Sequence, residues 1–138
     1  MRTAQASLTV ETRGRGLTEI TERIDRWLGG SDIRTGVLHI FCRHTSASLL
    51  INENAAPAVQ RDLLAWLDRV APEGEYYEHD SEGPDDMPAH IKTLLTGSGL
   101  SVPIGEGRML LGTWQGVFLA EHRRRPHSRT IVLTVIGD

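Results

Sequence analysis

The sequence has few cysteines and no long apolar segment. Cys42 is the only cysteine among 138 residues, so the chain can form neither an internal disulfide nor a cysteine-based zinc cluster. No apolar run approaches the roughly 20 residues that a membrane-spanning helix needs, and MRTAQASLTVETR at the start lacks the apolar core of a signal peptide. We therefore expect a cytoplasmic protein with no membrane partner, in which His, Asp or Glu would hold any metal ion.

Excess charge and aromatic side chains are also scarce. The formal net charge is −3, and aromatic residues make up 5% of the chain. Nucleic-acid binding depends on many Lys and Arg residues along one face, and single-strand binding also uses stacking aromatics. We therefore expect no nucleic-acid partner. The basic stretch HRRRPHSR at 122–129 is either a solvated hairpin tip or a group of arginines that reaches a phosphate.

The spacing of apolar residues predicts one α+β domain over residues 1–138. The elements that we expect are a strand at 3–11, a helix at 17–28, a strand at 37–44, a helix at 57–70 and a short helix at 87–95. The last third is punctuated by glycines and has short β-forming runs, which predicts an antiparallel meander. The expected fold is a single compact domain with a largely antiparallel sheet and helices packed on one face.

HDSEGPDDMPAH, at residues 79–90, predicts a metal site. His79 and His90 can meet only if the segment between them folds back. His44, at the polar end of the strand at 37–44, would complete a three-nitrogen site, or a carboxylate such as Asp86 would join the two histidines. Such ligands suit a divalent cation, whether zinc, magnesium or manganese, and leave one position open. The alternative is a solvated acidic loop in which Asp85 or Asp86 caps the following helix.

Other polar residues lie at the ends of the predicted elements. Thr45 and Ser46 can donate to an anion or satisfy nearby backbone groups. Asn54 is placed to cap the helix at 57–70. Glu121 interrupts an apolar strand pattern, and a buried carboxylate needs a partner. Arg123 offers a guanidinium group for a phosphate.

Three stretches, HTSASLLINEN, DDMPAHIK and GTWQGVFLAEHR, resemble the YjbQ-like family, which is also described as the secondary thiamine-phosphate synthase family. The stretches occur in the family's order and at its separations, and the resemblance covers essentially the whole chain. It implies a compact α+β domain that assembles as a homotrimer. It also implies an activity that joins a pyrimidine pyrophosphate to a thiazole phosphate with release of pyrophosphate.

The resemblance and the residue chemistry together define the expected site. The expected catalytic residues are His44, His90 and Glu121, and the expected metal ligands are His44, His79, Asp86 and His90. The expected substrate-binding residues are Thr45, Ser46, Asn52, Asn54, Lys92, Thr113, Trp114, Gln115, His122 and Arg123. We therefore expect a metal-dependent enzyme that acts on phosphorylated small molecules, with a transferase side activity like that of thiamine-phosphate synthase. The alternative is a non-catalytic binding protein for a metal or a phosphorylated ligand.

Overall fold

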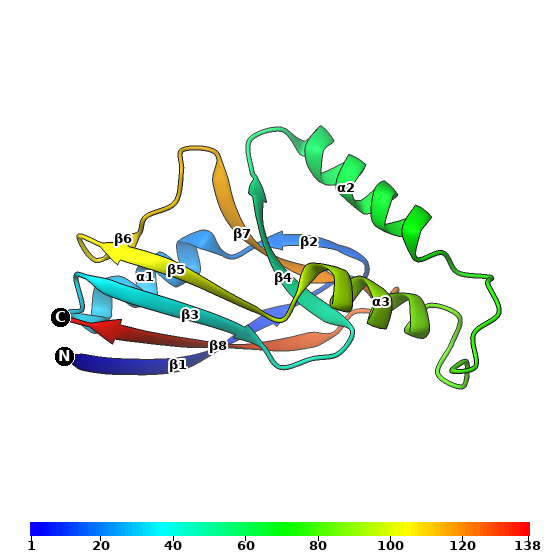
Figure 1. The fold of residues 1–138 in the computed structure, drawn as a ribbon, viewed down its shortest axis with the longest axis horizontal. Coiled ribbons are helices and arrows are strands. Elements are labelled where there is room, and N and C mark those ends of the chain that lie inside the picture. Colours follow the sequence, from blue (N-terminus) through cyan, green and yellow to red (C-terminus); the bar gives the residue numbers. More distant parts are fainter.

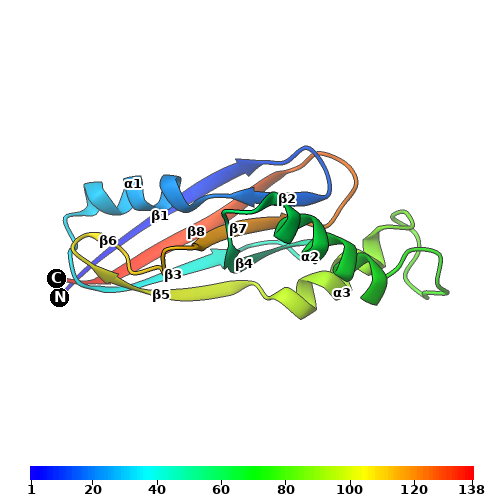
Figure 2. The same ribbon diagram turned by 90° about the horizontal axis from the view of Figure 1, so that it is seen from above.

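The computed structural model describes all 138 residues as three helices and eight strands (Figures 1 and 2). The helices are α1 (Thr21–Ser31), α2 (Pro57–Val70) and α3 (Asp86–Thr96). The strands are β1 (Arg2–Glu11), β2 (Gly16–Glu19), β3 (Gly36–Cys42), β4 (Ala47–Glu53), β5 (Gly99–Gly105), β6 (Arg108–Met109), β7 (Gln115–Glu121) and β8 (Ser128–Gly137). None of the helices is long and apolar enough to cross a bilayer.

The strands form two antiparallel sheets. The larger sheet has the order β1-β8-β3-β5-β6, and the smaller has the order β2-β7-β4. The predicted α+β class and antiparallel pairing are confirmed, but the predicted meander is wrong, because β7 pairs with β2 and β4 instead of β8. In β7 every residue from Gly116 to Glu121 is buried, so this strand is covered on both faces and shows no alternation that would reveal its neighbours.

The core lies between the larger sheet and a layer made of α1 and the smaller sheet. In β3 the side chains of Leu38, Ile40 and Cys42 point into this core, as their alternation predicts. Ile24 and Leu28 from α1 belong to the same cluster of buried residues. The smaller sheet therefore shares with α1 the task of covering the larger one, a role that the sequence assigned to helices alone.

The start of α1 differs from the prediction. The apolar spacing predicts a helix from Leu17, whereas Gly16–Glu19 is the strand β2 and the helix begins at Thr21. β2 pairs with β7, and the amide of Ile20 donates to the carbonyl of Val117. Backbone pairing with a distant strand therefore outweighs the local helical pattern.

The segment between α2 and α3 carries the acidic stretch. α2 begins at Pro57, where its fixed φ favours the first helical turn, and this start is as predicted. α3 begins at Asp86, one residue before the predicted start, and Gly97 follows its last residue. The connecting segment lies at one end of the molecule, beyond the strand ends (Figure 1).

Candidate metal centre

Asp86 and His90 project from the same face of α3. They are the first and fifth residues of the helix, and residues four apart in an α-helix are neighbours on its surface. Asp86 also lies in the first turn, where a carboxylate is favoured by the helix dipole. His79 reaches this face because the chain turns back through Gly83, whose φ of 104° is readily adopted only by glycine.

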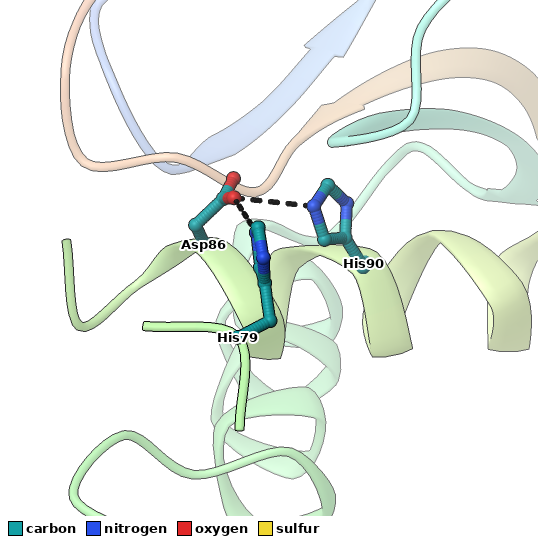
Figure 3. A group of neighbouring side chains, drawn as sticks. All are labelled: His79, Asp86 and His90. Atoms are coloured by element: carbon teal, nitrogen blue, oxygen red, sulfur yellow. Dashed lines mark hydrogen bonds and ion pairs between the residues drawn. The ribbon is translucent and has the colours of Figure 1, made fainter. Parts of the chain in front are cut away.

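The three side chains converge on one point (Figure 3). The Nε2 atoms of His79 and His90 lie 2.7 Å and 3.2 Å from Oδ2 of Asp86. One ligand atom from each residue lies within 4.8 Å of the other two. A tetrahedral metal bound at 2.0–2.2 Å needs donor atoms about 3.4 Å apart. Small side-chain adjustments would therefore admit a cation, so the residues present fit a metal.

Neighbouring groups hold two of the ligands in place. Nδ1 of His90 donates to the carbonyl oxygen of Thr45 at 2.8 Å, which directs Nε2 toward Asp86. The other carboxylate oxygen of Asp86, Oδ1, accepts from Nη1 of Arg123 at 2.8 Å. Metal-binding histidines and carboxylates commonly have such outer partners, which fix their orientation. One nitrogen of His90 and one oxygen of Asp86 are thus left facing the same place.

Arg123 ties the β7–β8 connection to the acidic segment. Its Nε donates to Oδ2 of Asp85 at 3.0 Å and its Nη2 to the carbonyl of Glu82 at 2.9 Å. The backbone amide of Arg124 also donates to Oδ2 of Asp85, at 2.9 Å. The sequence suggested a phosphate as the partner of Arg123, whereas the structure gives it two carboxylates, and in this way it positions Asp86.

These contacts keep both carboxylates ionised. Burial alone raises the pKa of Asp86, but the hydrogen bond to His79 and the charges of His90 and Arg123 outweigh it, so the pKa lies below its ordinary value. Burial likewise raises the pKa of Asp85, and hydrogen bonds from Arg123 and Arg124 reverse the shift. Asp86 is therefore available as an anionic ligand at neutral pH.

His44 lies outside this group of ligand atoms. Its Nε2 accepts a hydrogen bond from the amide of Thr130 at 2.8 Å. Burial, followed by the positive charge of Arg129, lowers its pKa, so the ring is neutral at pH 7. His44 and His90 line one cavity, but the two rings do not converge on a single cation. The metal-binding role of His44 stays a prediction.

Glu121 has only internal partners. It is 1% exposed and forms an ion pair with Arg129, and it accepts from the hydroxyl of Thr12 at 2.7 Å. Burial raises the pKa of Glu121, but the hydrogen bonds from Arg129 and Thr12 lower it by more than burial raises it. The pKa therefore lies below its ordinary value, and the group is ionised. Nη2 of Arg129 also donates to Oγ of Ser46 at 3.0 Å. Glu121 and Ser46 thus form part of a buried network between β7, β8 and the start of β4.

His122 and Lys92 are also buried. Nε2 of His122 lies 2.8 Å from Oγ of Ser48. Burial, followed by the charge of Lys92, lowers the pKa of His122 to about 4. Nζ of Lys92 donates to Oδ1 of Asp68 at 2.7 Å. Neither residue reaches the metal cluster, and their roles in substrate binding stay predictions.

The remaining predicted residues lie around the far ends of β4 and β7. Nδ2 of Asn54 donates to Glu19 at 2.9 Å, and Oε1 of Gln115 accepts from the amide of Gly112 at 2.7 Å. Oδ1 of Asn52 accepts from the next amide along the chain. Thr113 and Trp114 are exposed in the connection between β6 and β7. Within one chain, the predicted site residues therefore lie in two groups. One group is near the start of β4 and the end of β7, and the other is near the end of β4 and the start of β7 (Figure 1).

Two features of this end of the molecule were missed from the sequence. The first is the spacing of Asp86 and His90, which are four residues apart at the start of a helix. Both residues were predicted as ligands, but the shared helix face that their spacing predicts was not noticed. The second feature is Thr93, which lines the cavity beside His90. Nothing local distinguishes this threonine from a solvated helical residue.

The fold and the cluster define an α+β protein of two packed antiparallel sheets that carries two histidines and an aspartate at the start of a helix. The chain belongs to the UPF0047, YjbQ-like family, whose model matches residues 6–138. It is 47% identical over 135 residues to a UPF0047 protein of Synechocystis sp., a match that covers 97% of this chain and 92% of the relative. It is 43% identical to the UPF0047 protein YjbQ of Salmonella typhimurium, covering 97% and 98% of the two chains.

A solved structure shows the same fold. A YbjQ-like protein from Sulfolobus solfataricus matches with a TM-score of 0.88 at 22% identity, covering 99% of this chain and all of the other. The family resemblance inferred from the three sequence stretches is thus confirmed.

The function expected from that resemblance is corrected. The family and the two relatives are described only as UPF0047 proteins, and the Sulfolobus protein is described as being of unknown function. These findings give no support to a metal-dependent enzyme for phosphorylated molecules with thiamine-phosphate synthase activity. They do not favour the non-catalytic alternative either.

Proposed function

We propose that the chain holds one divalent transition-metal cofactor at His79, Asp86 and His90. The observation that supports this most directly is the convergence of their ligand atoms within 4.8 Å of one another. Two imidazoles and one carboxylate suit zinc, manganese or iron. Magnesium is disfavoured, because it prefers oxygen ligands. Among the metals suggested by the sequence, zinc and manganese fit these residues best.

Three protein ligands would leave coordination positions for a small molecule. Asp86 is 2% exposed, whereas the imidazoles of His90 and His79 are 30% and 43% exposed. The ligands thus combine a buried anchor with two rings that solvent reaches. A bound metal of this type polarises an oxygen atom that occupies its open position. The function that this geometry supports is a metal site open to an exchangeable oxygen ligand.

The test is metal binding by the full chain without a histidine tag. Zinc and manganese are titrated calorimetrically into chelator-treated protein, and the bound metal is also measured by elemental analysis. We expect about one ion per chain, and at least a tenfold loss of affinity in Asp86→Asn and His90→Ala. The matched control is His39→Gln, which removes an exposed imidazole of β3 that contacts Ser101 on β5. Unchanged affinity in both folded site variants would reject the proposal.

We also propose that the chain assembles as the homotrimer implied by the family resemblance. α2 has 14 residues but only one buried side chain, Leu67. Trp66 and Val70, on the same side of this helix, are 49% and 43% exposed. A short helix gains most of its stability from packing its apolar face. Contact with another copy would supply that packing.

A further inference from the structure

The outer face of the larger sheet is open to solvent in a single chain. The core lies on the other face, where β3 and β8 place Leu38 and Leu133. On the outer face, Val37 of β3 is 51% exposed and its neighbour across the strands, Ile136 of β8, is 46% exposed. Phe41, farther along β3, is 44% exposed. Three large apolar side chains of two adjacent strands are therefore left without a packing partner.

The centre of this outer face has no charged side chain. The strand registers place on it Thr3, Gln5, Ser7 and Thr9 of β1, Thr130, Val132, Thr134 and Ile136 of β8, Val37, His39 and Phe41 of β3, and Gly99, Ser101 and Pro103 of β5. None of them is Asp, Glu, Lys or Arg, although such residues make up 24% of the chain. Charged residues come at the strand ends, where Glu11 ends β1, Arg43 follows β3 and Asp138 follows β8. An uncharged centre with a charged rim is the composition of a protein interface.

The strand at the margin of this face, β1, has an open edge. It pairs only with β8, in a register that runs without a bulge from Arg2 to Glu11. β1 contains neither proline nor lysine. Proteins usually protect a long edge strand with one of these residues, with a bulge, or with a covering chain. Since the first three are missing from β1, its edge is expected to be covered in the assembled protein.

Charge favours another copy of the same chain as the covering partner. Each chain carries a formal net charge of −3, so two copies repel one another least where their surfaces are uncharged. The Ser and Thr hydroxyls and the Gln amide of the face both donate and accept hydrogen bonds, so the face can pair with an identical one. The outer face therefore suits self-association.

The size of the face agrees with a contact that α2 supplements. Four strands about 4.8 Å apart, with outward side chains over roughly 27 Å of strand, give an area on the order of 500 Å². One partner in a stable interface buries about 800 Å². The exposed side of α2, with Trp66 and Val70, supplies further area.

We infer that the outer face of β1, β8, β3 and β5 packs against other copies of this chain. The inference rests on the proposed homotrimer in one respect, because three such faces would then surround the threefold axis and each would touch both neighbours. The packing of the face itself does not depend on α2 or on the number of copies.

The test is the mass of the full chain in solution by light scattering, with folding checked by circular dichroism. Thr134→Lys places a charge at the middle of the face, on the strand between β1 and β3. Val37→Lys is the second variant, since a lysine at this half-exposed position stays solvated in a single chain. We expect three chain masses for the unmodified protein and one for each folded variant. Thr18→Lys, at an exposed threonine of β2 in the smaller sheet, is the control and should keep the mass of the unmodified protein.

The outcomes separate this inference from the homotrimer proposal when Trp66→Asp is measured alongside. Three chain masses that persist in both face variants would reject the inference and leave the trimer. Two chain masses that fall to one in Thr134→Lys and Val37→Lys, but not in Trp66→Asp, would support the inference and reject the trimer. A single chain mass for the unmodified protein would reject both.

Discussion

The pair formed by Glu121 and Arg129 carries opposite charges at 1% and 4% exposure. Removing one member of a buried pair leaves the other charge uncompensated, which typically costs 3–5 kcal/mol. We expect Glu121→Gln to lower the free energy of unfolding by about this amount, measured by urea denaturation. Glu11→Gln, at an exposed position that accepts from Ser128, is the control.

That same variant also addresses the catalytic role expected of Glu121. If the residue is structural, the folded fraction of Glu121→Gln should still bind metal at His79, Asp86 and His90. A variant of unchanged stability would contradict the structural role.

His122 makes stability depend on pH. Its folded pKa of about 4 lies below the ordinary value of 6.5, so the unfolded chain binds a proton that the folded chain excludes between these values. The stabilisation is complete above pH 6.5 and is lost as the pH falls from 6.5 to 4. We expect His122 to account for a loss of about 2 kcal/mol between pH 7 and pH 5. The loss should be absent from His122→Asn in urea titrations, and an equal loss in the variant would contradict the assignment.

At the scale of the elements, Arg123 joins the β7–β8 connection to the start of α3. Its hydrogen bond to Asp86 holds that ligand in place. Orienting groups around metal ligands typically contribute 10–100-fold to affinity. We therefore expect Arg123→Gln to weaken zinc binding at least tenfold in the calorimetric titration. Arg125→Gln, in the same connection, is the control, because Arg125 is exposed and contacts His127 only through its carbonyl. Equal affinities in the two variants would show that Arg123 does not position Asp86.

The elements differ in how far the sequence predicts them. β3 is foreseen because its buried and exposed residues alternate along the sequence. α2 is foreseen because Pro57 marks its start. β2 is not foreseen, since its four residues become a strand through pairing with β7. The approach of His79 to His90 is predicted as a possibility by Gly83 and the prolines, and Asp86 is among the ligands expected from the sequence. The start of α3 at Asp86 explains why its carboxylate and His90 share one helix face.

At the scale of the whole molecule, the exposed apolar side of α2 determines whether copies associate. Placing a charge there should prevent the packing of Trp66 against another chain. We expect the unmodified protein to have three times the chain mass by light scattering, and Trp66→Asp to have the mass of one chain. Arg61→Asp, at an exposed position on the opposite side of α2, should leave the mass unchanged. A monomeric unmodified protein would reject the homotrimer.

The sequence by itself determined the α+β class, the family, most element positions and the segment that carries the metal ligands. These depend on local periodicity, turn residues and short motifs, which are written along the chain. Only the tertiary structure decided that β7 leaves β8 for a second sheet, that Glu121 pairs with Arg129, and that His44 faces a cavity instead of the cluster. Each of these depends on contacts between residues far apart in sequence, where burial and pairing override local preference.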